Sequence, residues 1–166
     1  MEKQEFTIKL CNWLKNFLQK RFSENYEILD VFAPPSSLSK LNNDHIKQLA
    51  NYSSWDFKPD VLGILKEKKS GRLELVLLNR STSALSLKEI GEINCYARLT
   101  DAFLVFVSSL NGVSNEVNIL LLEDAIRDRV LKYGDKSIIV FGWDEKNDRL
   151  NSDSVIPFSK KDFIVN

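Results

Sequence analysis

The chain has 166 residues, which is enough for one domain with a substantial hydrophobic core. Hydrophobic residues make up 43% and charged residues 28% of the chain, as is typical of an ordinary soluble globular protein. Basic and acidic residues number 23 each, so the formal net charge is zero, which argues against strong non-specific DNA binding but permits a local basic patch. No apolar run has transmembrane length, and two cysteines on expected helices suggest reduced thiols, so we expect a cytoplasmic protein without a membrane partner.

The N-terminal third predicts a helix, a strand and a second helix. Residues 5–22 carry apolar side chains at helical spacing, which predicts an amphipathic helix. Residues 26–32 alternate as a strand does, and Ala33-Pro34-Pro35 ends that strand. Residues 38–52 repeat apolar side chains at near-helical spacing, so we expect a short helix there, although Asn42-Asn43-Asp44 interrupts the pattern.

A hairpin is predicted in the centre of the chain. Residues 60–65 and 73–78 are short, nearly continuous apolar runs, as is typical of strands buried on both faces. The segment between them is charged and contains a glycine, which predicts a tight connection. With this connection as the turn, Asp60 lies opposite the end of the second strand, next to Asn79, whereas Glu74 lies roughly 17 Å along the strand from Asn79.

A helix and a parallel strand are expected after the hairpin. Ser86 followed three residues later by Glu89 is a capping box, which predicts that a helix begins at the next residue, Leu87. Residues 102–108 are the most strand-like run of the chain. Because a helix between two strands favours a crossover connection, we expect this run to pair in parallel with the second hairpin strand. The side chains expected to be almost fully buried are Leu75, Leu77, Val105 and Val107.

The C-terminal third is less regular. Residues 115–133 predict a helix, although 117–122 could instead form a strand, because periodicity alone does not decide between the two. Residues 137–143 predict a further strand, and residues 144–153 read as a polar loop. Order resumes after this loop, with a last short turn around Phe163.

These elements predict one α/β domain over residues 1–166, with a central mixed β-sheet flanked by helices. A strand introduced by Pro59-Asp60, a hairpin, a strand that ends in polar residues and a following helix form the layout of a known family. In this layout the chain resembles the PD-(D/E)xK superfamily, which includes restriction endonucleases, archaeal Holliday-junction resolvases and many phage and repair nucleases. The resemblance covers residues 26–143 and implies a restriction-endonuclease-like core.

The resemblance also implies roles for particular positions. In the family, an Asp that starts the first hairpin strand and an acid that ends the second hold Mg²⁺, and a Lys two residues after that acid positions or activates the attacking water. Paired carboxylates fix a hard divalent cation, which then polarises phosphate and water. Asp60 matches the first acid, whereas Asn79 stands at the second acid position and Ser81 at the lysine position. The catalytic motif is therefore degenerate.

Two acids of the following helix are candidates to complete a metal site. Some restriction enzymes of the resembled family take their second acid from this helix, and Glu92 or Glu89 has that place here. Asp60 with Glu92 is the metal pair that this route implies, with Mg²⁺ as the cofactor if the chain is active. Lys88 or Arg80 is a candidate for the missing lysine, although a permanently charged arginine is a poor activator of water. The plain alternative for the two glutamates is a solvated helix face.

Three functional hypotheses follow. The first is a nuclease-like domain with a degenerate metal site that acts as an interaction module for nucleic acid, for a protein partner or for a second copy of the chain. The second is a divergent Mg²⁺-dependent DNA endonuclease that uses Asp60 with Glu92 or Glu89. The third is an unrelated α/β interaction domain that shares only the order of elements. No GxGxxG, Walker A, CxxC, HExxH or GxSxG motif indicates another chemistry.

A few further residues are weaker candidates for a site. His45 is the only histidine, so a metal or general-base role lacks the usual second histidine. Trp55 and Phe57 are expected to pack in the core, with stacking on a nucleic-acid base as the alternative. A modest basic face, expected to be solvated, is made by Arg127, Arg129 and Lys132.

Overall fold

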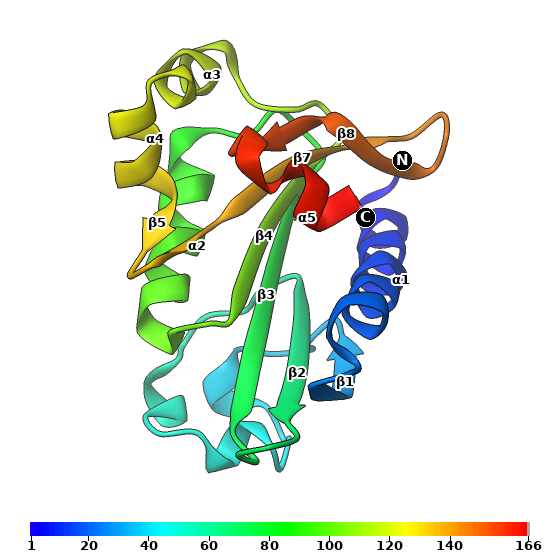
Figure 1. Cartoon of the computed structure of the whole chain (residues 1–166), viewed down its shortest axis with the longest axis vertical. Helices are drawn as coiled ribbons and strands as arrows, with labels where there is room; N and C mark the ends of the chain where they lie inside the picture. The colour runs from blue at the N-terminus through cyan, green and yellow to red at the C-terminus, as the bar shows by residue number, and fades with distance from the viewer. Residues whose placement is uncertain (166) are drawn as a thin grey trace.

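The first helix and the first strand form where the sequence predicts them. In the computed structural model, which describes residues 1–165, α1 spans Lys3–Phe22 and β1 spans Tyr26–Phe32. The apolar stripe of α1 is buried, and Phe6, Leu10 and Leu14 are each 0% exposed. Because this stripe packs on the sheet, α1 covers one face of it (Figure 1).

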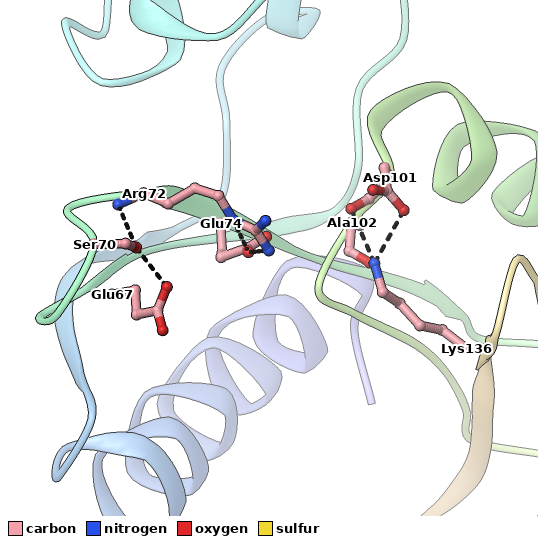
Figure 2. A network of polar contacts seen from close by, with 7 residues as sticks. All are labelled: Glu67, Ser70, Arg72, Glu74, Asp101, Ala102 and Lys136. Atoms are coloured by element: carbon pink, nitrogen blue, oxygen red, sulfur yellow. Dashed lines mark hydrogen bonds and ion pairs between the residues drawn. The ribbon is translucent and has the colours of Figure 1, made fainter.

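The central hairpin is confirmed. β2 (Val61–Glu67) pairs antiparallel with β3 (Leu73–Ser81), and Val61 lies opposite Leu78. Near the turn, Arg72 forms an ion pair with Glu74 in the part of the hairpin that Figure 2 shows. The second strand is longer than predicted, because it continues through the polar residues up to Ser81.

The helix and the parallel strand that follow the hairpin are also confirmed. α2 spans Leu87–Thr100 and begins with the predicted capping box, in which Ser86 and Glu89 bond reciprocally. β4 (Leu104–Ser109) pairs in parallel with β3. The four side chains expected in the core are at most 3% exposed: Leu75, Leu77, Val105 and Val107.

The sheet has six strands in the order β1-β2-β3-β4-β7-β8. β7 (Ile139–Asp144) extends the parallel part beyond β4, and β8 (Arg149–Ile156) returns antiparallel to it at the edge. α1 and α2 lie on opposite sides of this sheet (Figure 1), and each side has its own hydrophobic core. The predicted single α/β domain with a mixed sheet flanked by helices is therefore confirmed. The remaining small elements are β5 (Lys132–Tyr133), β6 (Lys136–Ser137), η4 (Phe158–Lys160) and α5 (Lys161–Val165).

The short helix expected at residues 38–52 is wrong. This segment forms three separate 3₁₀ turns, η1 (Leu38–Lys40), η2 (Ile46–Gln48) and η3 (Tyr52–Ser54). The side chain of Asn43 accepts hydrogen bonds from the backbone N–H groups that follow it, which competes with continuous helical bonding. Apolar side chains of the segment still reach the core: η1 contributes the buried Leu38, η2 contributes the buried Ile46, and Tyr52 of η3 packs against the core partly buried.

Two predictions in the C-terminal third are also wrong. The helix expected at 115–133 is divided into α3 (Asn115–Leu122) and α4 (Asp124–Leu131), because Glu123 between them has an extended backbone with ψ of 119°. The alternative strand at 117–122 does not form. The polar loop expected at 144–153 is mostly the β7–β8 hairpin, in which residues 145–148 make the turn.

Candidate functional site

The residues that the family resemblance singles out meet at one end of the sheet. Asp60 immediately precedes β2, Asn79 lies near the end of β3, and α2 starts shortly after it. Asp60, Asn79, Glu89 and Glu92 line one cleft with a volume of about 230 Å³. We call this cleft the acidic cleft; its other lining residues are Lys58, Arg80, Leu85 and Val107.

Asp60 is held by the end of the neighbouring strand. Its Oδ2 accepts a hydrogen bond from the backbone N–H of Arg80 at 2.9 Å, and its Oδ1 lies 3.7 Å from the guanidinium of the same residue. The side-chain oxygen of Asn79 accepts a hydrogen bond in turn from the backbone N–H of Asp60 at 3.2 Å. The carboxylate and the amide therefore tie β2 to β3, and the charge next to the carboxylate is that of an arginine.

Both helix acids have protein partners of their own. Glu89 accepts hydrogen bonds from the backbone N–H and the hydroxyl of Ser86, at 2.7 and 3.0 Å, as part of the capping box. Glu92 accepts a hydrogen bond from the hydroxyl of Tyr96 at 2.6 Å. Desolvation, together with this hydrogen bond to Glu92, raises the pKa of Tyr96 to about 12. The ring of Tyr96 is fixed by stacking on Phe57, with centroids 4.1 Å apart.

Ser81, at the lysine position of the motif, is not part of the acidic cleft. Its side chain is buried, with 6% exposure, and its hydroxyl lies 3.1 Å from that of Ser83. The backbone N–H of Ser83 also donates to the Ser81 hydroxyl. The residue thus supports the loop between β3 and α2 and has no access to a ligand in the cleft.

The cations of the site differ from those expected. Lys58 lines the acidic cleft and is exposed, and sequence reasoning missed it, although it stands directly before Pro59-Asp60. Arg80 lines the same cleft, while its Nε donates to the hydroxyl of Thr7 on α1. Lys88, the other candidate for the missing lysine, is exposed and does not line this cleft.

The side chains of the acidic cleft do not fit a bound Mg²⁺ ion as they stand. Within residues 1–165, no group of three or more His, Cys, Asp and Glu side chains is arranged to hold a metal ion. The carboxylates of Asp60, Glu89 and Glu92 each accept a hydrogen bond from a protein donor. A hard divalent cation requires oxygen ligands that surround it at about 2.0–2.6 Å.

The weaker candidates lie elsewhere. Trp55 and Phe57 are 5% and 7% exposed, so the stacking alternative for them is wrong and the packing prediction is confirmed. His45 is half-buried beside Asn43 and lines none of the clefts described here. In the basic face, Arg127 pairs with Asp124 and Lys132 pairs with Asp128, which neutralises part of its charge.

The chain was compared with family models, with curated proteins and with solved structures, and none of the three comparisons finds a match. Within residues 1–165, no helix has both the length and the apolar character that crossing a membrane requires. Cys11 and Cys95 are free thiols.

Proposed function

We propose that the chain is a nuclease-like domain that binds nucleic acid without cutting it. The observation that carries this proposal is the arrangement at the strand ends. The carboxylate of Asp60 accepts a hydrogen bond from the backbone of Arg80 and lies near its guanidinium, and the side chain of Asn79 accepts a hydrogen bond from the backbone of Asp60. In the resembled family this place holds a metal ion between two acids. Here a neutral amide, Asn79, stands at the position of the second acid, and the guanidinium of Arg80 lies beside the first acid, Asp60.

The order of elements supports the nuclease-like part of the proposal. Pro59-Asp60 leads into β2, the hairpin returns as β3 with polar residues at its end, and α2 then crosses to the parallel strand β4. This is the layout on which the resemblance to the PD-(D/E)xK superfamily rests, with the restriction-endonuclease-like core as its implied form. A shared layout concerns the fold, so the function is argued from the residues of the site.

The chemistry of the site favours binding over cleavage. An amide oxygen is a weaker ligand for Mg²⁺ than a carboxylate, and the Arg80 guanidinium beside Asp60 opposes the approach of a second cation. Because stabilisation of charge at phosphate is the main catalytic contribution in metal-dependent hydrolysis, loss of metal affinity removes most of the rate. Lys58 remains exposed at the strand ends and is available to a phosphate.

A divergent Mg²⁺-dependent endonuclease is the second candidate, and a specific observation favours it. Asp60, Glu89 and Glu92 do line one cleft together with Lys58, a primary amine of the kind that positions water in the family. A metal site would require Glu89 to leave the capping box and Glu92 to release Tyr96. That rearrangement costs about 1 kcal/mol for each hydrogen bond lost.

The decisive experiment measures binding and cutting on the same substrates. Labelled single-stranded, duplex and branched DNA are incubated with the chain, first in EDTA for binding by fluorescence anisotropy, then with Mg²⁺ or Mn²⁺ for cleavage. We expect binding in EDTA that weakens with salt, and no cleavage with either metal. Asp60→Ala and Glu92→Gln are the matched variants.

Each outcome has a defined meaning. Metal-dependent cutting that both variants abolish would overturn the proposal and establish the divergent nuclease. No binding to any nucleic acid would also overturn it, and would favour an interaction module for a protein partner or for a second copy of the chain. We place this activity in the cytoplasm, in keeping with the free thiols of Cys11 and Cys95.

A further inference from the structure

A second cleft opens on the other side of the same strand ends. It has a volume of about 370 Å³ and lies between the first two turns of α1, the segment after β1 and the ends of β2 and β3. Its charged lining residues are Lys3, Lys58, Asp60 and Arg80. We call it the basic cleft, because three cations face a single carboxylate.

The charges of the two clefts are opposite. The acidic cleft has three carboxylates against Lys58 and Arg80, so a phosphate that entered it without a metal would be repelled. In the basic cleft the one carboxylate, Asp60, already has Arg80 beside it. Lys3 and Lys58 remain, and both are exposed and take part in no ion pair among residues 1–165. The basic cleft can therefore accept an anion without a metal.

Arg80 gives the basic cleft a fixed cation. Its side chain is only 10% exposed, and its Nε donates to the hydroxyl of Thr7, which itself donates to the backbone carbonyl of Lys3 at 3.0 Å. These contacts hold the guanidinium against α1, so little side-chain freedom is lost when an anion binds. An arginine fork and two exposed lysines suit the several oxygens of a phosphate group.

The basic cleft also has an apolar wall. Ile8 on α1 is 56% exposed, and Ala33 and Pro34 line the cleft across from it. An inorganic anion gains nothing from contact with an apolar wall, whereas a sugar or a base attached to the phosphate can bury apolar surface against it. The volume of the cleft is at the lower end of the range for small-ligand pockets, which fits one nucleotide unit better than a duplex.

We propose that the basic cleft binds the phosphate group of a single nucleotide unit, either at the end of a nucleic-acid strand or in a free nucleotide. Lys3 and Lys58 hold the phosphate over Arg80, and the apolar wall contacts the sugar or the base. This inference rests on the proposed binding of nucleic acid, and it assigns that binding to a cleft on the α1 side of the strand ends.

The test compares short single-stranded oligonucleotides that differ only in a 5′- or 3′-terminal phosphate, in EDTA, by fluorescence anisotropy. We expect the phosphorylated strands to bind about tenfold more tightly, as the loss of one charge-assisted contact implies. Lys3→Gln combined with Lys58→Gln should abolish this preference. Lys88→Gln, which removes another exposed lysine that lines neither cleft, should preserve it.

Competition identifies the source of the phosphate. Adenosine monophosphate that displaces the phosphorylated strand, when adenosine does not, extends the site to free nucleotides; failure of both to compete restricts it to strand ends. Equal affinity for strands with and without a terminal phosphate would overturn the inference while the proposed function stands. No binding of any strand would overturn both. Circular dichroism of each variant controls for folding.

Discussion

The side-chain oxygen of Asn79 accepts a hydrogen bond from the backbone N–H of Asp60, at 3.2 Å. This hydrogen bond joins the residue before β2 to the end of β3, so it holds the two strands together at the candidate site. A carboxylate in the place of Asn79 would put a second negative charge beside Asp60, in a cleft that already has Glu89 and Glu92. The amide keeps the hydrogen bond and avoids the repulsion that a metal ion would otherwise have to neutralise.

Asn79→Asp should therefore create a dependence on metal ions. In EDTA we expect the variant to lose roughly 1 kcal/mol of unfolding free energy, the repulsion of two unit charges a few ångströms apart in water. Millimolar Mn²⁺ should restore the lost unfolding free energy, because a cation that binds only the folded state stabilises that state. Thermal unfolding followed by circular dichroism, with and without Mn²⁺, measures both effects. An equal response of the unmodified chain to Mn²⁺ would contradict this account of the amide.

Ser81→Lys should destabilise the fold rather than restore a catalytic lysine. Ser81 is buried and bonded to Ser83, so a lysine there must desolvate its charge or displace the loop before α2. We expect a loss of about 2 kcal/mol or more in chemical denaturation. The control is Ser81→Ala, which removes only the hydroxyl contacts and should cost about 1 kcal/mol. A stable Ser81→Lys variant would show that the loop has room for the longer side chain.

Leu77→Ala should be among the most damaging core substitutions. Leu77 is 0% exposed in the central strand β3 and belongs to the core on the α2 side. Truncation removes buried apolar surface and leaves a cavity, which typically costs about 2–5 kcal/mol. Urea denaturation measures the change. A loss well below 1 kcal/mol, outside the usual range for such substitutions, would be incompatible with this burial.

Tyr133→Phe should stabilise the chain and change its response to alkaline pH. The Tyr133 hydroxyl is buried without a hydrogen-bond partner within residues 1–165, so its removal should gain about 1 kcal/mol at neutral pH. Burial raises the pKa of Tyr133, and the stability that depends on the neutral phenol is complete below about pH 10, the pKa of an unfolded tyrosine. That stability is lost as the pH rises above this value.

The pH dependence of Tyr133 is measured as a difference between two proteins. Unfolding free energies of the unmodified chain and of Tyr133→Phe, compared between pH 9 and pH 11 (roughly one unit on either side of the unfolded pKa), should diverge in favour of the variant. Other tyrosines and lysines titrate in both proteins, so the difference isolates Tyr133. Parallel curves would mean that the phenol ionises equally well in the folded state.

The sequence predicted the elements whose signals are local. The hairpin followed from two apolar runs around a charged turn, and α2 followed from the Ser86 and Glu89 capping box. β8 was missed because it is an edge strand whose residues are mostly polar, and strand signals of this kind resemble those of a loop. The 3₁₀ turns were missed because single buried residues at irregular intervals imitate helical spacing.

The candidate site could be predicted only in part. Hairpin register places Asp60 beside Asn79, and helical spacing puts Glu89 and Glu92 on one face of α2. That this face borders the same cleft as Asp60 and Asn79 is known only from the structure. The contact between Arg80 and Thr7 joins residues far apart in the chain, because it depends on where α1 packs on the sheet. The basic cleft also depends on how α1 packs on the sheet, because segments far apart in the chain line it. Such arrangements have no local signature in a sequence.

Each side of the sheet carries its own tryptophan fluorophore. Trp55 is buried in the core on the α2 side, whereas Trp143 is buried in the core on the α1 side, where Trp13 also packs. Indole emission shifts to longer wavelength when the ring meets water, so a chain that keeps only Trp55 reports on one layer and a chain that keeps only Trp143 reports on the other. Coincident melting curves from these two chains would mean that both layers unfold as one cooperative unit, and separated curves would reveal an intermediate with one layer intact.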